Sequence, residues 1–358
     1  MEAFFVSIPT WATLILFIVG LVLIIKGGDW FVDSASWIAE VLGVPKFVIG
    51  ATIVSIATTL PEMIVSIAAT ANGNVEMAAG NAIGSVTANT AMIMGLFIIC
   101  MPFAVKRKEF APKACMMFSA AAVLILGCIF TERFQHEFIK GENNWYYSLS
   151  TVGIVILIVI FIAFFIENFM SMKNADSQIE PSPDSIGLQN EDDIVPTKET
   201  VSSKDWVKNI VMFLVGAGAT VIGAEVLVNG GTVLAENIGI PQRIISVIAI
   251  AIGTSLPELV TTITALRKKE GALSVGNILG ANIIDLTLIL PICSFVSVGK
   301  GNGALAVATS SVQIDMVVCL AAIAVGVIPT IITKEFKRWQ GAVMLFGYLG
   351  YVIATVAL

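Results

Sequence analysis

The chain has 358 residues, of which 57% are hydrophobic and 13% are charged, whereas about 25% charged residues is typical of soluble proteins. This composition excludes a soluble enzyme and a disordered protein, and a net charge of -6 without a basic patch excludes a nucleic-acid binder. Five cysteines without C-x-x-C spacing indicate neither a zinc site nor a disulfide framework. The apolar residues require a lipid bilayer around them.

Apolar runs of transmembrane length recur along the whole chain. A bilayer core about 30 Å thick needs about 20 apolar residues in one helix. Two acid-bearing segments are shorter: 28–43 is expected as a polar-edged extension that leads through a break into the second span, and 223–239 is its equivalent. Ten spans are expected, at approximately 8–26, 47–72, 78–101, 114–131, 145–167, 206–229, 240–266, 273–297, 304–331 and 339–357.

Lysine and arginine predict which way the chain faces, because they concentrate on cytoplasmic loops. If both termini are extracellular, 16 of the 20 basic residues lie in cytoplasmic loops. The sequence therefore predicts a multi-pass protein of the cell membrane with both termini outside. The four basic residues left outside are Arg133, Lys140, Arg243 and Lys300.

A polar segment at 168–205 divides the spans into two groups of five. It carries eight acidic residues against three lysines, with scattered apolar residues, and this is typical of a flexible linker. We expect a first five-helix half at 1–167, an acidic cytoplasmic linker at 168–205 and a second five-helix half at 206–358. The linker is either a tether or a segment regulated by ions or partners.

The two halves contain an internal repeat. Adding 196 to each residue number aligns 27–91 with 223–287 without a gap, and 17 of the 65 positions are identical. Because each half holds five spans, an odd number, the second copy is inverted in the membrane. The sequence thus predicts an all-α integral membrane protein with ten transmembrane helices in two inverted five-helix repeats, as in secondary transporters. A channel could be built in the same way.

The strongest repeated feature is a Thr-Thr/Ser-Leu-Pro-Glu segment, at 58–62 and at 254–258. It places Glu62 and Glu258 inside apolar spans, where a carboxylate costs about 2.5–3.5 kcal/mol. The proline before each glutamate has no N–H, so we expect the carbonyls of residues 57 and 253 to be free. With the neighbouring hydroxyls, these oxygens form a polar stripe on one helix face.

The next span of each half carries a second polar stripe at i, i+4 and i+8. Its residues are Asn81, Ser85 and Asn89 in the first half and Asn277, Ala281 and Asp285 in the second half. We expect the four stripes to converge near the midplane. Carboxylate, amide, hydroxyl and carbonyl oxygens without His or Cys suit Ca²⁺ or Na⁺. The predicted ligands are therefore transported inorganic cations, and no cofactor is expected.

The remaining intramembrane acids are expected at the periphery. Asp315 lies alone in the ninth span and has no counterpart in the first half, so a structural role is predicted for it. Asp29, Asp33 and Glu40 are expected at helix ends or in a vestibule.

The two polar segments resemble the alpha repeats of prokaryotic sodium/calcium exchangers of the cation/calcium antiporter superfamily. The similarity is strongest at 50–62 with 80–85 and at 249–258 with 276–285. It implies a secondary antiporter that exchanges Ca²⁺ for Na⁺ across the cytoplasmic membrane by alternating access, and not an enzyme. The metal ligands that the resemblance implies are Glu62, Glu258, Thr58 and Thr254 for Ca²⁺, and Ser55, Thr59, Ser85, Ala251 through its carbonyl, Ser255 and residue 281 for Na⁺, with Asn89 and Asp285 completing the centre.

Two departures from that family leave alternatives open. The first repeat has Ala57 and Thr59 where a Gly and a Ser are usual, and Ala281 lacks the hydroxyl of its repeat partner Ser85. Protons or K⁺ therefore remain candidates beside Na⁺. A cation channel with a ring of Glu62 and Glu258 is a further alternative. An intramembrane hydrolase is disfavoured because no residue pattern provides a positioned nucleophile.

Overall fold

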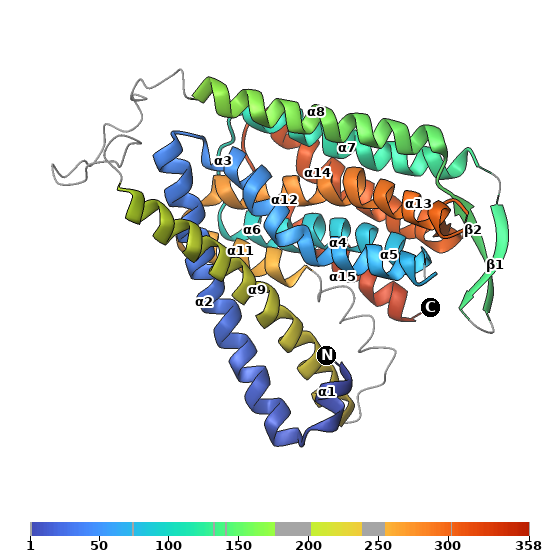
Figure 1. Ribbon diagram of the computed structural model, residues 1–358. Helices are drawn as coiled ribbons and strands as arrows, with labels where there is room; N and C mark the ends of the chain where they lie inside the picture. The colour runs from blue at the N-terminus through green and yellow to red at the C-terminus, as the bar shows by residue number, and fades with distance from the viewer. Residues whose placement is uncertain are drawn as a thin grey trace.

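The computed structural model describes residues 2–73, 75–131, 133–139, 142–175, 202–237, 255–301 and 303–357, and helices form most of it (Figure 1). Segments labelled η are π-helical turns. The first half contains α1 (Glu2–Ser7), α2 (Thr10–Leu42), α3 (Lys46–Ile49), η1 (Gly50–Val54), α4 (Ser55–Ala71), α5 (Val75–Thr87), η2 (Ala88–Met94), α6 (Gly95–Cys100), α7 (Arg107–Ile129), β1 (Arg133–Ile139), β2 (Glu142–Ser148) and α8 (Thr151–Ala175). The second half contains α9 (Ser203–Asn237), α11 (Leu256–Arg267), α12 (Gly271–Ile284), η4 (Asp285–Ile289), α13 (Leu290–Gly299), β3 (Ala306–Ala308), η5 (Ser311–Asp315), α14 (Met316–Thr333) and α15 (Arg338–Ala357).

Helix α2 is one continuous helix of 33 residues, so the expected place of segment 28–43 was wrong. The segment extends the first span and does not lead into the second. The helix ends where Gly43 adopts a left-handed conformation with φ of 64°, and the N–H of Val44 bonds the carbonyl of Ala39 at 3.0 Å. Pro45 follows and begins α3. Helix α9 is continuous through residue 237 in the same way.

Helices α2 and α9 form a pair that extends beyond the other helices (Figure 1). Two aromatic contacts join them: the ring centroids of Phe31 and Phe213 lie 4.7 Å apart, and those of Trp37 and Trp206 lie 5.2 Å apart. The repeat relates these two helices, because α2 holds residues 27–41 and α9 holds their counterparts at 223–237. Equivalent elements of the two halves thus pack against each other.

The two halves also meet at the centre of the molecule, where α12 packs against α3, η1 and α4. The approach is close enough to exclude side chains. A Cβ atom added to Gly276 would lie 2.1 Å from the carbonyl oxygen of Phe47, and one added to Gly50 would lie 2.2 Å from that of Leu273. Small residues at the interface therefore bring the two repeat segments into backbone contact.

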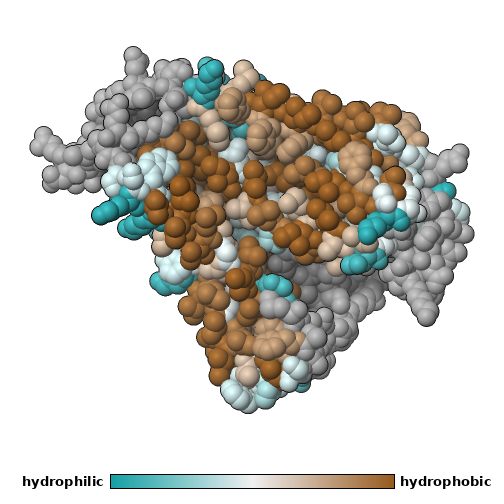
Figure 2. Space-filling model, in the orientation of Figure 1, coloured by the Kyte–Doolittle hydropathy of each residue, from teal (hydrophilic) through white to brown (hydrophobic). Residues whose placement is uncertain are grey.

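The described residues contain eight helices that are long and apolar enough to cross a membrane. Figure 2 shows hydrophobic residues over most of the surface of the coloured residues, as expected for a surface in contact with lipid. Helix α15 covers the tenth expected span, and α11 covers the described part of the expected span at 240–266. The membrane-embedded helical fold is confirmed, and the count of ten spans stays a prediction.

A small antiparallel sheet with strand order β1-β2-β3 covers one end of the helices, and the sequence analysis did not predict it (Figure 1). Strand β2 occupies the expected start of the fifth span, so α8 begins at Thr151. Tyr146 of β2 is buried, and its hydroxyl lies 2.7 Å from Oε2 of Glu76. The hydrogen bond anchors the strand on α5.

The loops expected on the cytoplasmic side meet at the opposite end. Lys46 Nζ lies 2.6 Å from Oε1 of Glu270, and the N–H of Val105 bonds the carbonyl of Lys334 at 2.9 Å. The first contact joins the start of α3 to the residue before α12, and the second joins the loop before α7 to the loop before α15. The grouping agrees with the distribution of basic residues.

Two further boundaries differ from the expected ones. Helix α7 begins at Arg107, so Lys113 lies within it and is fully buried instead of lying in a loop. Its Nζ lies 2.5 Å from Oε2 of Glu167 on α8. Helix α8 continues to Ala175 and α9 begins at Ser203, so both ends of the segment expected as a linker are helical.

Candidate ion-binding site

Three carboxylates from the two halves lie inside the helical core. Glu62 on α4, Glu258 on α11 and Asp285 on η4 are each 1% exposed. Among the described residues, only the hydroxyl of Thr58 approaches one of these carboxylates, that of Glu258, and the oxygens of Glu62 and Asp285 have no side-chain hydrogen-bond partner. Glu62 is near enough to Glu258 and Asp285 to interact with both electrostatically, and Asp285 interacts with Glu258. Four polar stripes were expected to converge, and the three acids that they carry lie within electrostatic range of one another.

The described carboxylate, histidine and cysteine side chains do not form a compact group of three or more that could hold a metal ion. An ion between Glu62, Glu258 and Asp285 would therefore need oxygens from hydroxyls, amides or backbone carbonyls as well. Such oxygens are present on the same helices. Three unbonded hydroxyls, those of Thr59, Ser255 and Thr261, are buried within four residues of Glu62 or Glu258.

Thr58 connects the two halves at the site. Its hydroxyl lies 3.2 Å from Oδ1 of Asn277 on α12 and 3.3 Å from the carbonyl of Ser55, and it also contacts Glu258. In the first half, Nδ2 of Asn81 donates a 3.0 Å hydrogen bond to the hydroxyl of Ser66. The two repeat-related asparagines thus have different partners.

Asn89 occupies the position equivalent to Asp285, and both residues lie at the beginning of a π-helical turn. Neither the amide nitrogen nor the amide oxygen of the Asn89 side chain has a hydrogen-bond partner among the described residues. Its turn, η2, packs against α11 and α12, whereas the turn of Asp285, η4, packs against α4 and α5. A π turn inserts one residue into a helix and is frequent at functional sites.

The other predicted ligands fall into two groups. Ser55 is fully buried, with its hydroxyl bonded to the carbonyl of Thr52 at 3.0 Å, and Ser85 on α5 is also buried. Thr254 and Ala251 lie outside the described residues. The described ligands thus lie on elements that pack against one another, namely α4, α5, η2, α11 and η4, and their joint role in binding ions stays a prediction.

The two prolines occupy different helical positions. Pro61 lies inside α4, where its missing N–H leaves the carbonyl of Ala57 without its helical donor. Pro257 lies in the first turn of α11, where no helical donor is required of it. Among the described residues, the repeated Leu-Pro-Glu sequence therefore lies in the middle of a helix in the first half and at the start of a helix in the second half.

The buried lysine does not balance the charge of the site. Lys113 pairs with Glu167 and lies 5.4 Å from the ring centroid of Phe47, so its charge is already compensated. Asp315 likewise has a partner, because the hydroxyl of Tyr351 lies 2.8 Å from its Oδ1. The peripheral role predicted for Asp315 agrees with this contact.

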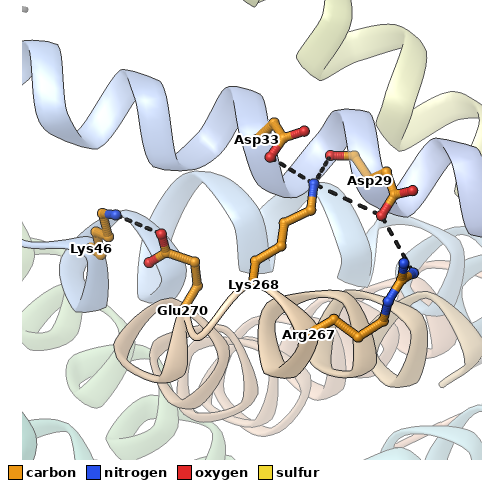
Figure 3. Close-up of polar contacts among 6 residues, drawn as sticks. All are labelled: Asp29, Asp33, Lys46, Arg267, Lys268 and Glu270. Atoms are coloured by element: carbon orange, nitrogen blue, oxygen red, sulfur yellow. Dashed lines mark hydrogen bonds and ion pairs between the residues drawn. The ribbon is translucent and has the colours of Figure 1, made fainter. Parts of the chain in front are cut away.

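An ion-pair cluster joins α2 to the helix that carries Glu258 (Figure 3). Lys268, at the end of α11, lies 2.6 Å from Oδ1 of Asp33 and 3.8 Å from Oδ1 of Asp29. Arg267 approaches Asp29 at 3.7 Å. The two aspartates were expected at a helix end or in a vestibule; they lie inside α2 and not at its end. Their basic partners are more than 200 residues away, so no local pattern predicts the pairing.

Asn282 lies on the same helix as Asn277 and was not among the predicted ligands. It is fully buried on α12, and its Nδ2 donates a 2.8 Å hydrogen bond to the hydroxyl of Thr90 on η2. Its Oδ1 has no partner within the described part of the chain. The repeat counterparts of this pair are Val86 and Leu286, which are apolar, so the contact has no repeat-related equivalent. This break in the repeat is the signal that could have identified it.

The chain is similar to known membrane transport proteins over nearly its whole length. The family model described as sodium/calcium exchanger protein matches residues 12–166 and 208–357. The sodium/calcium exchanger MaX1 of Methanosarcina acetivorans is 29% identical, with 95% of this chain and 97% of that protein covered. The inner membrane protein YrbG of Escherichia coli is 30% identical over 80% of each chain. A solved structure of the sodium-calcium exchanger NCX_Mj, soaked with 10 mM Na⁺ and zero Ca²⁺, matches with a TM-score of 0.73 and 25% identity, covering 98% of this chain and 100% of that one.

Proposed function

The chain belongs to the sodium/calcium exchanger family, and on this premise we propose that it is a secondary antiporter that exchanges Ca²⁺ for Na⁺ by alternating access. One observation carries the proposal: three buried carboxylates from both halves lie within electrostatic range of one another and form no ion pair with a basic residue among the described residues. Uncompensated charge inside a membrane protein is costly and marks an ion pathway. A divalent cation is the natural counter-charge for Glu62 and Glu258.

The proposed ligands follow from the chemistry of the donors. Ca²⁺ takes 6–8 oxygens in a flexible geometry. We propose that Glu62 and Glu258 provide its charged ligands, with Thr58 and Thr254 beside them. Asp285 and Asn89 complete the centre. The Na⁺ positions are proposed to use Ser55, Thr59, Ser85, Ser255 and the carbonyl of Ala251.

The charge of the site also accounts for coupling. A carrier with an empty site would have to occlude several negative charges, which is unfavourable in a low-dielectric interior. Bound Ca²⁺ or several Na⁺ ions neutralise these charges, so that only loaded carriers change access readily. If three Na⁺ exchange for one Ca²⁺, one net charge crosses per cycle, and the membrane potential contributes about 2.3 kcal/mol per 100 mV.

The protein is proposed to lie in the cytoplasmic membrane with both termini and the β1-β2 hairpin outside. The clustering of the basic loops at the opposite end supports this orientation. In a variant without native cysteines, a cysteine at position 300 should react with a membrane-impermeant maleimide in intact cells. A cysteine at position 337 should react only after permeabilisation. The reverse pattern would invert the topology.

The counter-ion is tested by ⁴⁵Ca²⁺ uptake into proteoliposomes. Vesicles loaded with Na⁺ and diluted into Na⁺-free buffer should accumulate ⁴⁵Ca²⁺, whereas vesicles with only a pH gradient or only K⁺ inside should not. Ala281 gives a reason to include the proton and K⁺ arms, because it removes a hydroxyl from the site. Uptake that ignores the Na⁺ gradient would refute Na⁺ exchange. Large unitary currents without any counter-ion would indicate a channel.

A further inference from the structure

Two basic loops that are far apart in the sequence lie side by side in the fold. The N–H of Val105 bonds the carbonyl of Lys334 at 2.9 Å, and the N–H of Phe336 bonds the carbonyl of Phe103 at 3.0 Å. These bonds join the loop before α7 to the loop before α15 in an antiparallel bridge. The sequence analysis found no basic patch, because the two loops are more than 200 residues apart. The fold assembles one, and this basic patch consists of Lys106, Arg107, Lys108, Lys334, Lys337 and Arg338, all of which are exposed.

Most of the charge in the basic patch has no acidic partner. Lys106 lies 3.8 Å from Glu109, and Lys337 lies 3.3 Å from Glu335. The other four basic residues form no ion pair among the described residues. The patch therefore carries an excess of positive charge at its surface, and this charge attracts an anion.

A cavity of about 290 Å³ lies beside the basic patch, between α3 and the start of α7. The rings of Phe47 and Phe110 line it and are buried, whereas the side chain of Lys106, which also lines it, is 80% exposed. The lining thus changes from apolar to charged toward the surface. A ligand that fits such a cavity has an apolar part and an anionic part.

The second lysine of the cavity does not supply free charge. Lys46 Nζ lies 2.8 Å from Oε1 of Glu40 and 2.6 Å from Oε1 of Glu270. Two carboxylates already compensate it. An anion in the cavity would therefore be held by the basic patch and not by Lys46.

The two loops are fixed relative to each other by aromatic contacts as well as by backbone bonds. The ring centroid of Phe336 lies 5.5 Å from that of Phe103 and 5.5 Å from that of Phe110. The basic residues of both loops are thus attached to one aromatic cluster. A site that is ordered before its ligand arrives loses less entropy on binding.

The basic patch lies where helices meet the surface of the bilayer. Helix α7 begins at Arg107, α14 ends at Thr333 and α15 begins at Arg338. Clusters of four to eight lysines and arginines next to a membrane span, and basic pockets between such helices, are typical binding sites for anionic lipids. A phospholipid also has the two parts that the cavity requires, because its phosphate lies at the bilayer surface and its acyl chains lie below it.

We propose that the basic patch and its cavity bind one anionic phospholipid. The two loops hold the phosphate, and the glycerol and the first acyl carbons pack against Phe47 and Phe110. The inference does not depend on which ions the protein exchanges, because it is tested by binding. Failure of Na⁺-driven uptake would refute the proposed function and leave this site untouched.

The test is the thermal unfolding of the full-length protein in uncharged detergent, titrated with short-chain phosphatidylglycerol at low salt. A ligand that binds only the folded protein raises the unfolding temperature as its concentration rises. Phosphatidylglycerol should do so at concentrations about tenfold lower than either short-chain phosphatidylcholine or inorganic phosphate. Equal effects of phosphatidylcholine, which has no net charge, would overturn the inference. Equal effects of inorganic phosphate would overturn it as well, because the ligand would then be a free anion.

The first variant removes one unpaired cation from each loop. Lys108→Gln with Arg338→Gln should raise the phosphatidylglycerol concentration for the half-maximal shift at least about tenfold. Lys204→Gln with Lys208→Gln is the matched control, because these exposed lysines at the start of α9 carry the same total charge. The control should leave that concentration within about twofold. Equal effects of the two double variants would show a response to net charge only and overturn the inference.

The second variant fills the cavity without a change in charge. Ala272 lines the cavity and is exposed, so Ala272→Leu should reduce the space for the lipid while the helix stays intact. We expect it to raise the phosphatidylglycerol concentration for the half-maximal shift about tenfold, whereas the smaller Ala272→Ser should not. An unchanged concentration in Ala272→Leu would overturn the assignment of the cavity to the lipid.

Discussion

The hydroxyl of Thr58 on α4 lies 3.2 Å from Oδ1 of Asn277 on α12, and this hydrogen bond links the two halves beside the carboxylates. The hydroxyl shares its proton with the carbonyl of Ser55 at 3.3 Å. These two acceptors fix the direction of the Thr58 hydroxyl. Its lone pairs stay available for an ion. Asn277 is thus expected to position a ligand without binding the ion itself.

Replacement of Asn277 should therefore weaken Ca²⁺ binding without changing the charge of the site. We expect Asn277→Ala to raise the Ca²⁺ concentration for half-maximal exchange about 10-fold, within the range of 10–100-fold that loss of a supporting contact to a metal ligand costs. Asn168→Ala is the matched control, because Asn168 is a buried asparagine of α8 that bonds the carbonyl of Phe164. Equal effects of the two substitutions would contradict the assigned positioning role.

The glutamates themselves should be far less tolerant. Glu62→Gln and Glu258→Gln each remove half of the charge that balances Ca²⁺, so exchange should fall by more than about 100-fold, beyond the usual effect of a supporting residue. Asp285→Asn should weaken exchange less. Glu109→Gln, at the start of α7, is the control for a glutamate outside the core. The measurement is initial ⁴⁵Ca²⁺ uptake per unit of reconstituted protein, and wild-type flux in either glutamate variant would remove the assignment.

The sequence predicted the central carboxylates because the repeat itself identifies them. Glu62 and Glu258 follow the same Leu-Pro pair at a fixed offset, and an acid inside an apolar span has few structural uses. Local patterns could not predict the partners of Asp29 and Asp33, since Lys268 reaches them from more than 200 residues away. The extent of α2 was missed because its acids interrupt the apolar run, whereas the helix continues through them and holds Asp29 and Asp33 against Lys268.

The β1-β2 hairpin shows a different limit. Trp145 and Tyr146 continue an apolar run into the fifth span, so hydropathy alone extends the helix over them. The strand forms because Tyr146 pairs with Ala308 of β3 and its hydroxyl bonds Glu76. Both partners belong to other parts of the chain, and the tertiary contacts override the local helical pattern.

The ion pair of Lys113 with Glu167 makes a prediction about stability. Lys113 is fully buried, so removal of one partner should leave an uncompensated charge, and such a loss costs about 3–5 kcal/mol. We expect Glu167→Gln to lower the thermal unfolding temperature in detergent strongly. The double variant Lys113→Met with Glu167→Gln should recover part of that loss, because it leaves no unpaired buried charge. A double variant less stable than Glu167→Gln alone would show that the lysine stabilises α7 by another contact.

The cluster of Lys268 with Asp29 and Asp33 permits a comparison of two adjacent lysines. Lys268 lies at the end of α11 with its side chain 26% exposed, and it approaches both aspartates of α2. Lys269 follows directly with a φ of 60° and forms no ion pair among the described residues. Lys268→Gln should lower the unfolding temperature by about 2–4 °C, which corresponds to about 1 kcal/mol for partly exposed ion pairs. Lys269→Gln changes the net charge by the same amount but should lower the unfolding temperature far less.

Salt distinguishes the ion pairs from other effects of the same substitution. At 1 M salt the Debye length falls to about 3 Å, so exposed ion pairs contribute less than at low salt. The difference between Lys268→Gln and Lys269→Gln should therefore narrow as the salt concentration rises. Lys268 also donates a 3.0 Å hydrogen bond to the backbone carbonyl of Asp29, and the stabilisation from this bond should remain at high salt. A difference independent of salt would assign the stabilisation to this hydrogen bond and to packing, and not to the paired charges that join α2 to the helix of Glu258.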